Sequence, residues 1–217
     1  MGSTGTVSIG TVWSLVITIT LILTVEALHS LKDVQEGPCE GIQYKSQEDI
    51  NMKWLASVQL PYVLAGSKYH MYRFVKYHHK VPLKEVSEYK FYYESCFRSY
   101  ANVSAGHARI HGFNGELTAP YLLKPTSEKG VLEFVPTEID NEVARHYLTL
   151  TDNKTYALFA NCWLGPDQRS WVLVSTEESL SQGTLQMIED HLVSLGFERQ
   201  QFIFFNHCAC EHFEAVA

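Results

Sequence analysis

The stretch "YLTLTDNKTYALFANCWLGPDQRSWVLVS" (147–175) contains three runs of aromatic and β-branched residues separated by two turn signals. The segments Asp152 to Lys154 and Gly165 to Asp167 are rich in the residues that turns favour, because glycine and asparagine adopt positive φ angles at little cost. Runs of this length and composition are typical of strands joined by short turns. The stretch therefore predicts an antiparallel sheet.

The same pattern extends from Glu88 to Ser175 and is followed by one helix. An earlier strand is expected to begin near Trp54 and run towards Pro61, and a short last strand is expected at 201–205. The helix is predicted because the apolar residues at 185, 188, 192 and 195 form one stripe. Ser181 or Thr184 can cap its start. The predicted strands between these elements are 89–104, 107–113, 116–124, 129–136, 144–151, 155–163 and 169–175.

Many short strands without helices between them predict an antiparallel barrel or sandwich. A barrel closed on itself removes the sheet edges, and about eight strands leave room for one small ligand. A sandwich of about nine strands fits the periodicity almost as well. The strand pattern alone leaves both architectures open.

Residues 1–27 are predicted to be a secretory signal peptide. Val12 to Val25 is an uncharged apolar run of 14 residues, whereas a spanning helix needs about 20. Val25-Glu26-Ala27 supplies the small residues of a cleavage site. A buried N-terminal helix and a signal anchor are the alternatives. The mature chain would be one domain, residues 28–217, secreted and extracellular.

Charge excludes one class of partner. The chain has 17 Lys and Arg against 24 Asp and Glu. Removal of Glu26 with the signal peptide leaves the mature chain with a net charge of 17 − 23 = −6. A mildly acidic surface argues against binding nucleic acid or an anionic membrane over the whole surface.

All five cysteines lie in the predicted mature chain, where an oxidising compartment favours disulfides. Five is an odd number, so one thiol is left over. The tail "HCACEH" (207–212) places two thiols and two imidazoles together, which is also a zinc-like ligand set. Two sequons, at Asn102 and Asn153, are candidate glycosylation sites.

Three motifs resemble the lipocalin family, in particular its apolipoprotein D-like and arthropod bilin-binding branch. They are "NMKWLASVQLP" (51–61), which is similar to the first-strand motif, "YESCFRSYANVS" (93–104), similar to the second strand, and the stretch 147–175, similar to the sixth to eighth strands. The resemblance implies an all-β fold: an eight-stranded up-and-down antiparallel barrel, or calyx, with one C-terminal helix packed outside. Met52, Asn153 and Ser175 depart from the family pattern, so the chain would be a divergent member.

The resemblance also implies disulfides from Cys39 to Cys162 and from Cys96 to the tail. The tail partner would be Cys208 or Cys210, and the remaining thiol would be free, capped or linked to a second chain. On this interpretation "HCACEH" is a disulfide anchor, and no metal site is expected.

Strand alternation predicts which side chains point into the barrel. If Asn102 carries a glycan it points outward, so alternate residues of its strand point inward. An outward Cys162 has the same consequence for the strand 155–163, and Trp54 is added from the first-strand motif. The candidate cavity residues are Trp54, Phe97, Ser99, Ala101, Val103, Ala157, Phe159, Asn161 and Trp163, with Ser99, Asn161 or a tyrosine hydroxyl orienting the ligand. A filled core without a cavity is the alternative.

Residues 62–95 are interpreted as a long insertion in the first loop. Its segment "KYHMYRFVKYHHK" (68–80) is basic and aromatic and contains no acid. In lipocalin-like barrels this loop lies over the open end, so Tyr69, Tyr72, Phe74 and Tyr77 are candidate lid residues. A solvent-exposed insertion without such a role is equally compatible with the sequence.

The sequence carries no motif that indicates catalysis or a cofactor, such as G-x-S-x-G, H-E-x-x-H or a P-loop. The expected function is therefore binding and transport of a small hydrophobic or amphipathic ligand: a pigment, retinoid, sterol, fatty acid or amine. The alternative is an interaction or inhibitory scaffold that uses 62–95 to contact another protein. A barrel enzyme is a third, weaker possibility.

Overall fold

A computed structural model describes residues 35–41, 44, 46–77, 97–112, 117–137 and 143–205. The predicted signal peptide lies outside these residues, as do Cys96, Cys208 and Cys210. Within the ranges given, no helix is both long enough and apolar enough to cross a membrane.

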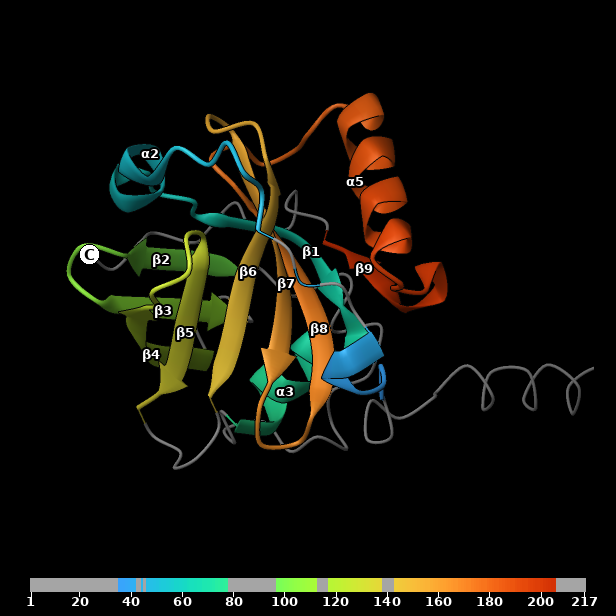
Figure 1. Ribbon diagram of the computed structural model, residues 1–217, viewed down its shortest axis with the longest axis horizontal. Coiled ribbons are helices and arrows are strands. Elements are labelled where there is room, and N and C mark those ends of the chain that lie inside the picture. Colours follow the sequence, from blue (N-terminus) through green and yellow to red (C-terminus); the bar gives the residue numbers. More distant parts are fainter. Residues whose placement is uncertain are drawn as a thin grey trace, which may run out of the picture. The chain divides into compact units, whose positions relative to one another are not determined.

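The described strands form one antiparallel sheet that closes into a barrel (Figure 1). The sheet order is β2-β3-β4-β5-β6-β7-β8-β1-β9, and β1 also pairs with β2, so β1 to β8 make a closed circuit with β9 added outside. The eight-stranded barrel is therefore confirmed and the sandwich is excluded. The strands are β1 (Tyr62–Ser67), β2 (Arg98–Asn102), β3 (His107–Gly112), β4 (Leu117–Pro125), β5 (Val131–Pro136), β6 (Ala144–Thr151), β7 (Tyr156–Trp163), β8 (Gln168–Ser175) and β9 (Phe202–Phe204).

The closing seam between β1 and β2 is short. The strands pair at Tyr62 and Arg98, where the backbone N–H of Ser99 donates to the carbonyl of Pro61 at 2.8 Å. On its other side β1 pairs with β8 at four positions. The first strand is thus anchored mainly through β8, and it reaches β2 only at its start.

The prediction of a strand beginning near Trp54 was wrong. Residues Met52–Ser57 form the helix α2, and the first barrel strand starts at Tyr62. The Asn51 side chain accepts hydrogen bonds from the backbone N–H groups of Lys53 and Trp54, which satisfies donors that a helix start leaves free. The sequence of α2 contains no β-branched residue, so nothing local opposes a helix.

The interpretation of residues 62–95 as a single loop insertion is also corrected. Residues 62–67 are β1, a wall of the barrel, and Lys68–Tyr77 form the helix α3. Of this segment, only 78–95 lies outside the described residues. The basic-aromatic segment is therefore helical over most of its length.

The strands predicted from 107 to 175 are confirmed, and their ends agree with the prediction to within two residues. The predicted helix is α5 (Gln182–Ser194), and Ser181 rather than Thr184 caps it by accepting from the Thr184 backbone N–H. Gly196 follows with φ of +98°, a left-handed conformation that glycine adopts without strain. Short 3-10 turns, η2 (Cys39–Gly41) and η5 (Arg199–Gln201), complete the described elements.

Apolar side chains pack in two clusters, one on each side of the barrel wall. One fills the interior. The other lies between α5 and the outer faces of β1, β7 and β8, where Leu158, Trp171 and Leu173 pack with Ile188 and Leu192. The helix thus covers outward residues of β7 that would otherwise expose apolar surface. Figure 1 shows α5 alongside this part of the barrel.

Asn153 connects α2 to the barrel. It has a positive φ of 56° in the turn between β6 and β7. Its Oδ1 accepts from the backbone N–H of Asn51 at 2.7 Å, and its Nδ2 donates to the carbonyl of Asp49 at 3.1 Å. The start of α2 is therefore held against this end of β7.

We expect Asn153→Ala to lower the free energy of unfolding by about 1–3 kcal/mol, because it leaves two backbone groups without their partner and strains a left-handed position. Urea unfolding of the variant and the wild type would measure the loss. Asn153→Gly is the control for the backbone term, since glycine tolerates the positive φ but cannot make the two bonds. Equal stability of all three proteins would contradict the role given to this side chain.

Candidate functional site

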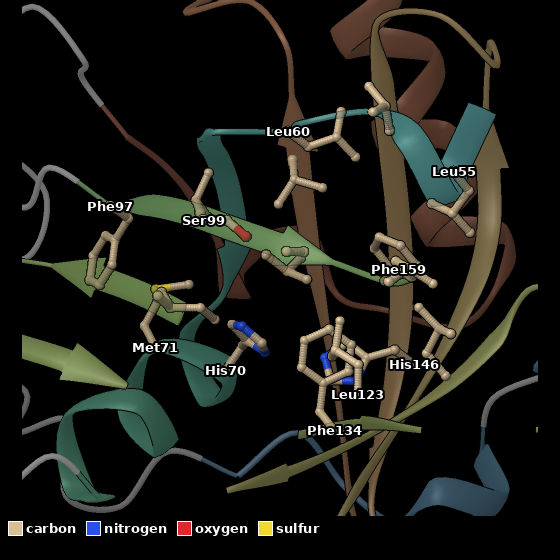
Figure 2. Close-up of a pocket in the computed structure, with 18 residues that line it drawn as sticks. Leu55, Leu60, His70, Met71, Phe97, Ser99, Leu123, Phe134, His146 and Phe159 are labelled. Atoms are coloured by element: carbon tan, nitrogen blue, oxygen red, sulfur yellow. The ribbon is translucent and has the colours of Figure 1, made fainter. Parts of the chain in front are cut away.

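The barrel encloses a cavity lined by eighteen described residues (Figure 2). Fifteen of them are apolar, and the other three are His70, Ser99 and His146. The centre of a water molecule can occupy about 60 Å³ of this space. Because that volume counts only positions of the water's centre, the cavity has room for several waters.

Residues from α2 and α3 line opposite ends of the cavity. Leu55 belongs to α2, whose start is bonded to the turn before β7. His70 and Met71 belong to α3, and His70 contacts Asn161 near the far end of β7. Eight residues of strand span roughly 26 Å, so β7 separates the two helices by nearly the length of the barrel.

Five of the nine cavity residues expected from the sequence lie in the lining: Phe97, Ser99, Ala101, Val103 and Phe159. Four of these come from β2 and its flanks at alternate positions, as the period of a strand requires. The inner face of β2 and its flanks therefore contributes these four residues to the lining.

The other four expected residues lie elsewhere in the interior. Ala157 is buried within the apolar cluster, and Trp54 packs against that cluster from α2. Asn161 and Trp163 are buried at the α3 end, where they make hydrogen bonds behind His70. None of these four side chains is among the lining residues.

The lid candidates on α3 divide into two pairs. Tyr69 is buried with Ala144 and Trp163, and Tyr72 packs beside them. The side chains of Phe74 and Tyr77 lie outside what the structure describes. The residues of this helix that line the cavity are His70 and Met71, which the sequence reasoning missed as lining residues because it treated the segment as a loop.

His70 is held by a hydrogen-bonded group at the end of β7 and β8. Its Nδ1 lies 3.3 Å from Nδ2 of Asn161 and 3.5 Å from Oγ of Ser170. The indole N–H of Trp163 donates to the same Ser170 Oγ at 2.9 Å. Burial lowers the pKa of His70 to about 4, so its imidazole is neutral at physiological pH.

His146 lies on β6 beside His70, with ring centroids 6.3 Å apart. Its Nδ1 is 3.4 Å from the carbonyl oxygen of Ala144, and its ring lies against Phe134 with centroids 3.9 Å apart. Burial holds the pKa of His146 well below its usual value. Two neutral imidazoles therefore meet in an otherwise apolar cavity.

The N-terminal segment holds the start of α3 in place. The side chain of Glu36 is buried, and its Oε1 accepts from the backbone N–H of Tyr69 at 3.0 Å. Burial raises the pKa of Glu36 to about 8. The guanidinium of Arg73, 2 % exposed, lies over the Trp163 ring at 5.0 Å. This end of the barrel is thus built from 35–41, α3 and the β7–β8 turn.

The disulfide between Cys39 and Cys162 is confirmed, with Cα atoms 5.5 Å apart. It attaches the N-terminal segment to β7 at the same end of the barrel. The second expected bridge, from Cys96 to Cys208 or Cys210, lies outside the described residues and stays a prediction.

The two sequons differ in their surroundings. Asn102 is exposed at the end of β2, although its Oδ1 accepts from the Ala105 backbone N–H at 2.8 Å. Asn153 is half-buried, and both ends of its amide are hydrogen-bonded. Asn102 is therefore the more accessible acceptor of the two. In the described part of the chain, no three side chains of His, Cys, Asp or Glu gather as a metal site would require.

The fold agrees with the resemblance to lipocalins. Similar solved structures include lobster apocrustacyanin A1, at 14 % identity with a TM-score of 0.46 over 76 % of this chain and 89 % of that chain. Apocrustacyanin C2 is 14 % identical, with a TM-score of 0.47 over 79 % of this chain and 89 % of that chain. Apocrustacyanin C1 is 14 % identical, with a TM-score of 0.46 over 76 % of this chain and 89 % of that chain. A likeness at this level says nothing of ligand or function. No family model and no curated protein matches the chain.

Proposed function

We propose that the protein binds one small, uncharged and largely apolar ligand inside the barrel. The observation that carries this proposal is the cavity itself, in which fifteen of eighteen lining residues are apolar and three are polar and neutral. Ligand sites of this kind combine apolar burial with a few polar groups that set orientation. Burial of apolar area contributes roughly 25 cal/mol per Å² before the costs of association.

Size and charge narrow the ligand class. A cavity of about 60 Å³, with room for several waters, suits a small molecule such as one with a single ring, whereas a pigment, retinoid or sterol would need the cavity to widen. No carboxylate, guanidinium or ammonium group is among the described lining residues. Fatty acids and amines are disfavoured for that reason, because an unpaired charge is costly to bury.

We also propose that the protein is secreted and carries or sequesters its ligand. The Cys39–Cys162 disulfide supports an oxidising compartment, and the exposed Asn102 supports glycosylation there. The alternative is an interaction scaffold that uses 62–95, and no observation on the described part of that segment favours it.

Filling the cavity is expected to weaken binding at least tenfold. Ala101 lines the cavity, so Ala101→Leu should occupy space that a ligand needs. Binding of toluene and p-cresol, measured by calorimetry, would test this, together with native mass spectrometry of the purified wild type for a retained small molecule. Toluene and p-cresol serve as probes of one ring.

Ala105→Leu is the matched control, because it makes the same change at an exposed turn residue. Equal affinities of the two variants would place the ligand elsewhere on the molecule. A wild-type protein that retains no small molecule and binds neither probe would refute the proposed function.

A further inference from the structure

We propose that His70 and His146 recognise a neutral hydroxyl group on the ligand, with Nε2–H of His70 donating to its oxygen and Nε2 of His146 accepting its hydrogen. This inference rests on the proposed function, since it assigns a ligand class to the same cavity. Both imidazoles belong to the lining and lie in one region of it (Figure 2).

The proton of His70 is placed by its neighbours. The indole N–H of Trp163 can only donate, and it donates to Ser170 Oγ. The hydroxyl hydrogen of Ser170 is thereby left for another acceptor, and Nδ1 of His70 lies at 3.5 Å. The Asn161 amide nitrogen, also a donor, approaches the same Nδ1 at 3.3 Å. With the Asn161 amide in this orientation, which leaves its Oδ1 without a hydrogen-bond partner, Nδ1 is the acceptor nitrogen and a neutral His70 carries its proton on Nε2.

His146 has the opposite tautomer. Its Nδ1 faces the carbonyl oxygen of Ala144, which can only accept, so Nδ1 carries the proton. Burial lowers the pKa of both histidines, which keeps each imidazole neutral and each tautomer defined. The Nε2 of His146 is then a free lone pair.

Neither Nε2 has a hydrogen-bond partner among the described residues, since the bonds of both rings are made by Nδ1. One donor and one acceptor are thus available within a cavity whose remaining lining is apolar apart from Ser99. A hydroxyl group both donates and accepts at one oxygen, so it can satisfy both nitrogens together.

Charged head groups fit this pair poorly. A carboxylate can accept from His70 but offers nothing to the lone pair of His146. A protonated amine can donate to His146 but meets the N–H of His70. No counter-ion lines the cavity in the described residues, so either charge would be buried without compensation.

The test compares p-cresol with toluene, which differs from it only by lacking the hydroxyl. Affinities for the full-length protein, His146→Phe and His70→Phe would be measured by calorimetry. We expect each substitution to lower the affinity for p-cresol at least tenfold more than the affinity for toluene. His107→Phe is the matched control, since His107 is exposed on β3, and we expect its affinity ratio to equal that of the wild type.

The outcomes separate this inference from the proposed function. If both probes bind the wild type and their affinity ratio is unchanged in both variants, hydroxyl recognition is wrong and cavity binding stands. Tighter binding of benzylammonium or benzoate than of p-cresol would also overturn the hydroxyl assignment. If neither toluene nor p-cresol binds and the purified wild type retains no small molecule, both proposals fail.

A second measurement requires no substitution. Long-range ¹H–¹⁵N spectra of the wild type report which nitrogen of each imidazole is protonated. We expect the Nε2–H form for His70 and the Nδ1–H form for His146, and the same form in both rings would overturn the donor–acceptor pairing.

Discussion

Replacing both Cys39 and Cys162 with serine is expected to lower the free energy of unfolding by about 2–5 kcal/mol. The bridge joins residues 123 positions apart, so it removes many conformations from the unfolded chain. Denaturant unfolding followed by circular dichroism, without reductant, would measure the loss. The double variant is preferred to either single variant because it leaves no new free thiol.

The bridge is reinforced by hydrogen bonds at the same place. The side-chain oxygen of Gln168 accepts from the backbone N–H groups of Glu36 and Gly37, both at 3.2 Å, and the Arg169 N–H donates to the Gly37 carbonyl at 3.0 Å. An unchanged unfolding midpoint in the double variant would mean that these bonds alone hold the segment. Gln168→Ala, which keeps the disulfide, is the control that isolates them.

The strands and turns of the stretch 147–175 could be predicted because their signals are local, whereas the choice of a barrel over a sandwich rested on the resemblance to lipocalins. Asp152 accepts hydrogen bonds from the backbone N–H groups of Lys154, Thr155 and Tyr156, so the turn is set by residues adjacent in sequence. The alternation of side chains along β7 then follows from strand geometry. Such features need no knowledge of distant contacts.

The first strand and the polar part of the cavity could not be predicted in this way. The spacing of Trp54 and Pro61 suggested a strand, although the cap at Asn51 favours a helix. His70 became a cavity residue only because α3 packs against Asn161, which is 91 positions away in sequence. Its tautomer depends in turn on the Trp163–Ser170 bond, and no local pattern indicates such a chain of contacts.

The second large expected effect is a fall in the stability of the protein with rising pH, caused by the buried carboxyl of Glu36. Burial disfavours the charged form of this carboxyl and raises its pKa in the folded protein from the ordinary value of 4.5 to about 8. The folded state therefore holds a proton that the unfolded state releases between these two values. Stability is greatest below pH 4.5 for this group and is lost as pH rises through 8. At about 1.4 kcal/mol per pKa unit, the loss is on the order of a few kcal/mol.

The histidines act in the opposite direction at lower pH. Burial lowers the pKa of His70 to about 4 and that of His146 well below 6.5, so their contribution is present above pH 6.5 and is lost as pH falls below it. Between pH 6.5 and 8.5, the contribution of Glu36 to the free energy of unfolding therefore changes while that of the two histidines does not. Urea unfolding across this window should show wild-type stability falling with rising pH.

Glu36→Gln should remove that fall. Glutamine keeps the oxygen that accepts from the Tyr69 N–H but cannot ionise, so the variant should already be more stable than the wild type near pH 6.5 and exceed it by a wider margin near pH 8.5. Glu40→Gln, at an exposed position four residues away, should retain the wild-type slope. If Glu36→Gln retains that slope as well, the carboxyl is already ionised in the folded protein, and the start of α3 is held by a charged acceptor rather than a neutral one.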